Sequence, residues 1–189
     1  LNTQHGVLLQ ITDDQLLHPS INRKDLFNVA DVATGTGIWL EQVAALLGDI
    51  PTSQPRSFHG FDLSAAMFPT DHGRIKYSTH DVTKPFPEEH LGRYDLVHVR
   101  LLAMAIREED IVTIVTNLIG LLRPGGYLQW DDIDLNSFSS FDGIIIDFAK
   151  QVGYSLRLTE VVQEACAKRG LQGVSRQQYS VGAKPGLAQ

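Results

Sequence analysis

The sequence has little cysteine, no long apolar run and no basic cluster, and each of these absences removes a class of protein. The single cysteine, Cys166, excludes an internal disulfide framework, and no stretch resembles a signal peptide or a membrane span of about 18 apolar residues. We therefore expect a cytoplasmic setting. Sixteen Lys and Arg against 22 Asp and Glu give a net charge of −6, which argues against nucleic-acid and membrane partners. A small molecule is the expected ligand, and the oligomeric state stays open.

What the sequence does contain is typical of one globular domain: 189 residues, 43% of them hydrophobic and 20% charged. Short β-type runs alternate with amphipathic helical patterns, which predicts a Rossmann-like α/β fold with a doubly wound, mostly parallel sheet between two helical layers. Residues 1–26 form a helical or irregular lead-in, and residues 27–189 form the domain. The predicted strands are 27–32, 56–62, 74–81, 94–100, 127–130 and 174–181, and the predicted helices are 38–47, 107–122, 141–152 and 158–169.

A glycine turn, Ala33-Thr34-Gly35-Thr36-Gly37, connects the first predicted strand to the first helix of the domain. Such a turn presents backbone N–H groups and a helix N-terminus to a ligand. The dinucleotide fingerprint needs a third glycine where this chain has Leu40, so a nicotinamide cofactor is disfavoured.

Two acidic residues, Asp62 and Asp81, follow the second and third predicted strands. A carboxylate at the first of these positions can accept hydrogen bonds from both hydroxyls of a ribose. Two carboxylates beside one crevice suit a nucleoside with a neutral or cationic tail, whereas they would repel phosphates. Each carboxylate could instead cap its own turn, because Asp is a favoured capping residue.

Five ordered stretches resemble the class I S-adenosylmethionine-dependent methyltransferases: VADVATGTG (29–37), GFDLS (60–64), HDV (80–82), YDLV (94–97) and LLRPGGY (121–127). TGTGIW (34–39), VHVRLL (97–102) and GGYLQW (125–130) are similar to the branch that acts in fungal secondary metabolism. The resemblance implies an enzyme that uses S-adenosylmethionine to methylate an O, S or N atom of a small secondary metabolite.

The resemblance also implies roles for individual residues. Asp62, with its neighbour Leu63, would take the ribose hydroxyls, and Asp81 with the Val82 backbone would read the adenine amino group. The methionine end of the cofactor would lie against the first motif (Asp31, Ala33, Thr34, Gly35, Thr36, Gly37), and the methyl group would face the residues at the end of the fourth strand (His98, Val99, Arg100, Leu101).

The acceptor chemistry is less constrained, because methyl transfer from a sulfonium needs a base only if the acceptor must lose a proton. His98 and His5 are the candidate bases, although a lone histidine is often a structural hydrogen-bond partner. Arg100 could orient an acidic substrate or pair with the acidic run 131–134. Catechol-type relatives hold a metal with an acid where this chain has Arg100, so no metal is expected. The Asn-Pro-Pro-Tyr signature of amino-directed nucleobase methyltransferases is absent.

Two other functions stay open at this point, a regulatory or scaffold protein that keeps the cofactor site, and a fold recruited for a non-methylation reaction. The resemblance also implies seven strands, of which six can be counted here, and residue 1 is Leu rather than Met. We therefore expect a C-terminally incomplete domain from a protein some tens of residues longer.

Overall fold

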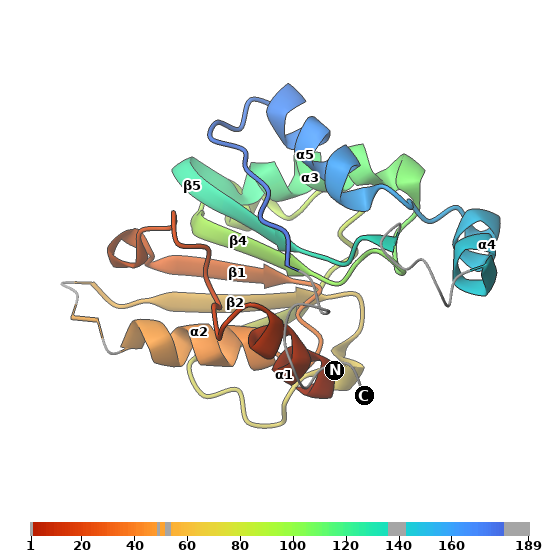
Figure 1. Ribbon diagram of the computed structural model, residues 1–189. Coiled ribbons are helices and arrows are strands. Elements are labelled where there is room, and N and C mark those ends of the chain that lie inside the picture. The colour runs from red at the N-terminus through yellow and green to blue at the C-terminus, as the bar shows by residue number, and fades with distance from the viewer. Residues whose placement is uncertain (1, 49, 52–53, 136–142, 180–189) are drawn as a thin grey trace.

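The computed structural model describes residues 2–48, 50–51, 54–135 and 143–179, and its centre is a parallel sheet. The five strands are β1 (Asn28–Val32), β2 (Ser57–Asp62), β3 (Ile75–Thr79), β4 (Tyr94–Arg100) and β5 (Leu122–Asp131), in the order β3-β2-β1-β4-β5. All four strand pairs are parallel. Together with the flanking helices, this confirms the predicted doubly wound, Rossmann-like fold (Figure 1).

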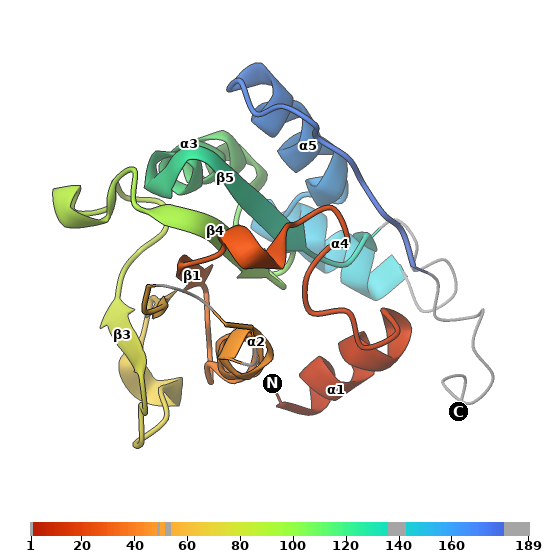
Figure 2. The ribbon, with the colours of Figure 1, turned by 90° about the vertical axis from the view of Figure 1, so that its left-hand side faces the viewer.

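Helices cover both faces of the sheet, as Figures 1 and 2 show. On one side lie α1 (Asn2–Ile11) and α2 (Ile38–Gly48), and on the other lie α3 (Ile111–Leu121) and α5 (Leu158–Lys168). Helix α4 (Gly143–Val152) stands at the end of the molecule. Short 3-10 turns fill the connections: η1 (Arg23–Asp25), η2 (Ala65–Met67), η3 (Glu88–His90) and η4 (Glu108–Asp110).

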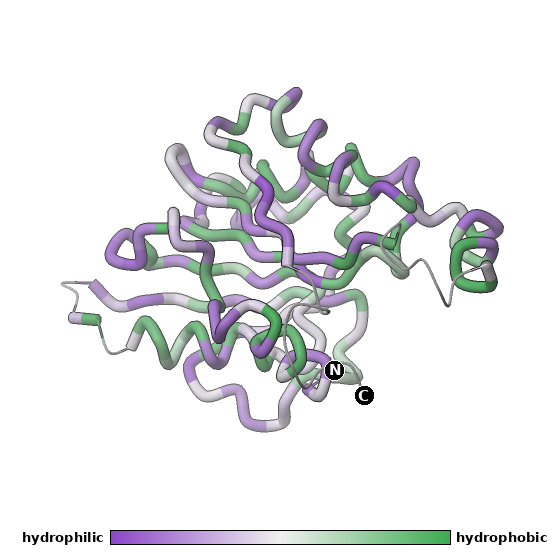
Figure 3. The backbone as a smooth tube through the Cα atoms, in the orientation of Figure 1, coloured by the Kyte–Doolittle hydropathy of each residue, from purple (hydrophilic) through white to green (hydrophobic). Residues whose placement is uncertain are grey.

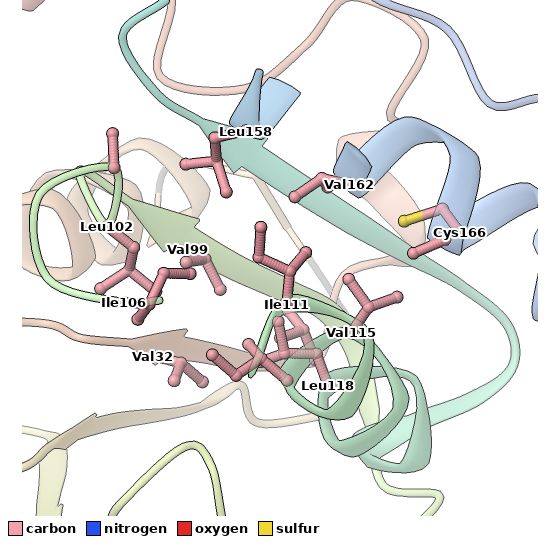
Figure 4. Close-up of a cluster of buried hydrophobic side chains, with 14 of the residues drawn as sticks. Val32, Val99, Leu102, Ile106, Ile111, Val115, Leu118, Leu158, Val162 and Cys166 are labelled. Atoms are coloured by element: carbon pink, nitrogen blue, oxygen red, sulfur yellow. The ribbon is translucent and has the colours of Figure 1, made fainter. Parts of the chain in front are cut away.

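The hydropathy pattern explains why the central strands are buried on both faces (Figure 3). Strand β4 reads Tyr-Asp-Leu-Val-His-Val-Arg, and its first six residues are buried, as expected of a central parallel strand. The core between the sheet, α3 and α5 (Figure 4) contains aliphatic side chains and the thiol of Cys166, which is 5% exposed. The sequence pattern places Cys166 on an apolar helix face, and the structure confirms this.

The lead-in is packed against the α2 side of the sheet. Leu17 and Leu26 are almost fully buried. The carbonyl oxygen of Leu16 accepts two hydrogen bonds, from Trp39 Nε1 of α2 (3.2 Å) and from Gln129 Nε2 of β5 (3.1 Å). The lead-in therefore contributes to the same core as the sheet.

Two predicted strands differ from the structure. Residues 174–179 form no strand, because they are largely exposed and no neighbouring strand pairs with them; residues 180 and 181 lie outside the described residues. Strand β5 starts at Leu122 rather than Tyr127, and its register shifts opposite Tyr94 and Leu96. A Cβ on Gly126 would come within 2.8 Å of the Tyr94 carbonyl, so this irregular pairing requires glycine.

The helix predicted over 141–152 is present in the structure over its described residues. Helix α4 covers Gly143–Val152, while Phe141 lies outside the described residues. Of its apolar residues only Ala149 is buried, and Ile144 is 84% exposed. The periodicity identified the helix, but an amphipathic pattern does not say what covers the apolar face.

Candidate cofactor-binding site

The predicted site residues gather at the carboxyl ends of the strands, around the point where the chain changes direction across the sheet. From β1 the chain proceeds through α2 to β2 and β3 on one side, and then crosses to β4 and β5 on the other. Ligands of doubly wound folds bind in the crevice that this reversal leaves at the carboxyl ends of the strands. The glycine turn follows β1, and Arg100 ends β4 at this position.

The glycine turn has the backbone conformation that its sequence predicts. Ala33, Gly35 and Gly37 have φ values of 59°, 57° and 74°, in the left-handed region that glycine adopts without strain. The turn is fixed by hydrogen bonds from Thr34 N to Phe61 O (3.0 Å) and from Gly37 N to Thr34 O (2.9 Å). A Cβ on Gly37 would overlap the hydroxyl of Tyr77 on β3, so this glycine is required for packing as well as for conformation.

The Asp62 carboxylate lies at the end of β2, directly beside the glycine turn. Its Oδ2 accepts a hydrogen bond from Gly35 N (2.8 Å), and its Oδ1 accepts a longer one from Ser64 N (3.3 Å). A carboxylate has about four lone-pair positions. Two therefore remain for hydroxyl groups of a ligand, so the capping role and the ligand role proposed for Asp62 are compatible.

Asp81 caps its own turn in the structure. Its Oδ1 accepts hydrogen bonds from both Thr83 N (2.9 Å) and Thr83 Oγ1 (2.7 Å), which lower its pKa. The second oxygen is left for another donor. The carbonyl of Val82 accepts from Asn117 Nδ2 of α3 (2.8 Å), which anchors this turn to the opposite helical layer.

His98 lies at the centre of the site, between two carboxylates. Its Nδ1 is 2.7 Å from Asp31 Oδ1 on β1, and its Nε2 is 3.1 Å from Asp131 Oδ2 at the end of β5. The ring is fully buried and stacks on Trp39 of α2, with centroids 3.5 Å apart. Burial alone would lower the pKa of His98, but the hydrogen bonds to Asp131 and Asp31 outweigh this effect and raise the pKa.

Helix α1 joins the site through two polar contacts. His5 Nδ1 lies 2.8 Å from Arg100 Nη1, and Thr36 Oγ1 of the glycine turn donates to Asn2 Oδ1 (2.7 Å). Because a guanidinium only donates, His5 accepts at Nδ1 and carries its proton on Nε2. A base role for His5 would therefore require this contact to open. Burial lowers the pKa of His5, and the charge of Arg100 lowers it further.

The acidic residues at the end of β5 and just after it make different contacts. Asp131 contacts His98, whereas Asp132 is fixed by backbone hydrogen bonds from Leu102 N (2.8 Å) and Ala103 N (3.2 Å). Burial raises the pKa of Asp132. Arg100 lies close enough to Asp131 to be stabilised by its charge, but hydrogen-bonds to His5. Within the described ranges, no group of three or more His, Cys, Asp or Glu is placed to hold a metal ion.

Two further predicted site residues, Val99 and Leu63, differ in how far their side chains are exposed. The side chain of Val99 is buried in the core on the α3 face, so only its backbone can face a ligand at the strand ends. Leu63 is 74% exposed. Sequence reasoning did not identify Asp131 as the partner of His98, nor Trp39 as the ring that covers it. The contact with Asp131 depends on the strand register, which pairs Asp31 with His98 and His98 with Gln129, two residues before Asp131.

Comparison with known proteins identifies the family of the chain. Residues 29–126 match the methyltransferase domain family. The chain is 48% identical to methyltransferase grgD of Penicillium sp over 142 residues, which are 74% of this chain and 50% of that protein. It is 33% identical to methyltransferase psoC of Aspergillus fumigatus over 65% of this chain and 43% of that protein. The chain thus spans about half the length of the curated relatives it matches.

Among solved structures, an O-methyltransferase family protein from Burkholderia thailandensis superposes with a TM-score of 0.65 and 17% identity. The match covers 90% of this chain and 53% of that one, and it shows the shared fold. A further relative is the secondary metabolism regulator LAE1 of Hypocrea atroviridis, 28% identical over 71% of this chain and 37% of that protein. The chain belongs to the methyltransferase domain family. No helix in the described part of the chain is both long and apolar enough to cross a bilayer.

Proposed function

We propose that this chain carries the S-adenosylmethionine-binding part of a methyltransferase that acts on an O, S or N atom of a small secondary metabolite. The observation that carries the proposal is the meeting of the glycine turn with the Asp62 carboxylate, where Asp62 Oδ2 holds Gly35 N at 2.8 Å. In a methyltransferase-family chain, this places a hydroxyl-accepting carboxylate beside a turn that a ligand can approach closely.

The residues present suit this cofactor, because the ends of β2 and β3 offer the carboxylates of Asp62 and Asp81 to its nucleoside part. Asp62 has lone pairs left for the ribose hydroxyls, Asp81 has a free oxygen for the adenine amino group, and the left-handed turn 33–37 would line the methionine end. The partly exposed carboxylate of Asp131 adds negative charge at the end of β5, which favours cationic groups. The cofactor supplies an electrophilic methyl group, and the residues of this chain bind and orient it.

In this proposal, the rate depends mainly on how the acceptor is positioned relative to the methyl group of the cofactor. An in-line displacement at a sulfonium methyl requires the acceptor to be held along one axis, and the protein gains rate by fixing that geometry. Arg100 and Leu101, at the end of β4, occupy the position that faces the reacting centre in the proposed arrangement. Leu101 has a φ of 59°, and Asp132 fixes the backbone that follows it.

The direct test is calorimetric titration of the folded protein with S-adenosylhomocysteine, followed by transfer of a radiolabelled methyl group to small hydroxyl, thiol and amine acceptors. Saturable 1:1 binding is expected. A protein that is folded by circular dichroism but takes up no heat would contradict the proposal. The transfer assay identifies the acceptor atom.

A second candidate function is regulation through a protein partner, and the similarity to regulator LAE1 supports it. Both functions need the cofactor site, so binding alone does not separate them. Methyl transfer to a small acceptor by the isolated protein favours the enzyme. Turnover that is absent alone and arises only within a stable heteromer favours the regulator.

A further inference from the structure

The two ring nitrogens of His98 both face carboxylate oxygens, and this fixes the charge of the ring. Nδ1 lies 2.7 Å from Asp31 Oδ1, and Nε2 lies 3.1 Å from Asp131 Oδ2. Ionised carboxylate oxygens only accept hydrogen bonds, so both nitrogens must donate. His98 is therefore an imidazolium that connects β1 to β5 across β4.

Each carboxylate is held by a second donor as well. Thr34 Oγ1 of the glycine turn donates to Asp31 Oδ2 (2.6 Å), and Gln129 Nε2 donates to Asp131 Oδ2 (2.9 Å). Gln129 in turn accepts from His18 N of the lead-in (3.0 Å). The bridge is thus continuous from the glycine turn through His98 to the segment that covers β5.

The two carboxylates differ in their access to water. The side chain of Asp31 is 4% exposed and that of His98 is 0% exposed, whereas the side chain of Asp131 is 48% exposed. The bridge therefore starts in the core and ends at the surface of the cofactor crevice. If His98 lost one proton, only one carboxylate could keep its hydrogen bond, and Asp131 would be released because water can solvate it at little cost.

We propose that His98 is a positioning residue, which ties the partly exposed carboxylate of Asp131 to the buried carboxylate of Asp31 and so fixes Asp131 at the edge of the cofactor crevice. The proposal rests on the proposed function above. In it, His98 does not abstract a proton from the acceptor, because its ring is fully enclosed by Trp39 and the two carboxylates. Instead it offsets the repulsion between the two carboxylates and holds the accessible one, Asp131, in place for the cationic end of the cofactor.

The charged and titratable groups around His98 come from four elements: Asp31 on β1, Asp131 on β5, Arg100 on β4 and His5 on α1. Helix α2 contributes the uncharged ring of Trp39. Burial disfavours the protonated ring, and the two carboxylates favour it. Since the folded-state pKa of His98 is raised, the bridge is present below pH 6.5 and is lost as the pH rises through that raised value.

The first test uses the wild-type protein without cofactor and reads the nitrogen-15 shifts of its histidine side chains. A His98 ring with both nitrogens protonated at pH 7 is expected. In the Asp131→Asn variant, the amide can donate to Nε2, so the ring should lose that proton at the same pH. A neutral ring in the wild type, or an unchanged ring in the variant, would overturn the proposal.

The second test measures the affinity for S-adenosylhomocysteine by calorimetry between pH 6 and 9. His98→Gln keeps one donor and should bind at least tenfold more weakly than wild type at pH 7, with a flat pH profile. His72→Gln, at an exposed turn outside the bridge, is the control and should match wild type. A folded His98→Gln protein with wild-type affinity would overturn the proposal.

The two tests also separate this proposal from the proposed function. If wild-type protein binds no S-adenosylhomocysteine, the cofactor assignment fails while the nitrogen-15 spectrum still reports on the bridge. If His98→Gln does not fold, Asp131→Asn serves in the calorimetric test as well, because Asp131 is partly exposed and its loss leaves the core intact. A tenfold weaker affinity in Asp131→Asn supports the proposal, and an unchanged affinity opposes it.

Discussion

Trp39 of α2 lies flat on His98 of β4, with ring centroids 3.5 Å apart and an angle of 7° between the planes. Both rings are buried, and the indole Nε1 donates to the carbonyl of Leu16 in the lead-in. One side chain therefore covers the buried histidine, fills the core beneath α2 and anchors the N-terminal segment.

Trp39→Phe should separate these roles from one another. Phenylalanine keeps a ring over His98 but loses the hydrogen bond to Leu16, so the free energy of unfolding should fall by about 1 kcal/mol, plus a smaller packing loss. Trp39→Ala removes the ring as well and should cost about 3–5 kcal/mol. Urea denaturation measures both values. Equal losses in the two variants would show that the ring contact contributes nothing.

Asp62→Ala should weaken binding of S-adenosylhomocysteine at least tenfold, or about 1.4 kcal/mol, because the ribose hydroxyls lose their acceptor and Gly35 N loses its cap. Calorimetry provides the measurement. The matched control is Asp71→Ala, which removes an acid that caps an exposed turn at Gly73 and should leave the affinity unchanged. Wild-type affinity in Asp62→Ala would remove this residue from the site.

The stability of the fold should decrease in mild acid because of His59. This residue stacks on Phe61, with centroids 4.1 Å apart, and burial lowers its pKa to about 4. The unfolded chain binds the proton near pH 6.5 and the folded chain only near pH 4, so stability is lost as the pH falls between these values. The loss reaches up to about 3 kcal/mol. His59→Gln should flatten this part of the pH profile, as followed by thermal unfolding.

Tyr77→Phe should leave the protein as stable as wild type or stabilise it by about 1 kcal/mol. The Tyr77 hydroxyl is buried beside Gly37 and, within the described part of the chain, has no hydrogen-bond partner. Gly37→Ala should be destabilising in both backgrounds, because φ is 74° and the ring carbons remain close, but less so without the hydroxyl. A double-mutant cycle in urea gives this coupling. Additive effects would contradict the predicted overlap.

Much of the fold could be predicted from local patterns, because β-branched runs and glycine turns specify parallel strands and their connections. Strands β1 to β4 start and end within two residues of their predicted positions. The predicted strand over 174–181 was wrong for its described part, because strand formation depends on a partner and not only on composition. The exposure of the apolar residues of α4 could not be predicted either, since an amphipathic pattern carries no information about which element packs against the helix.

The individual site residues could be identified from motifs, but the contacts between their side chains could not be predicted. The sequence identified Asp31 and His98 separately, and it treated Asp131 only as part of an acidic run. Their contact depends on the register of β1, β4 and β5, which brings together residues 67 and 33 positions apart. Register is set by packing of the whole sheet, so the bridge became visible only in three dimensions.

The two hydrogen bonds to the Leu16 carbonyl have a consequence for the order of folding. Its bond to Trp39 closes a loop of 23 residues, whereas its bond to Gln129 spans 113 residues. The bond to Trp39 needs only α2 in place, whereas the bond to Gln129 can form only once β5 lies beside the lead-in. We therefore expect the lead-in to reach its final position only when β5 has joined the sheet.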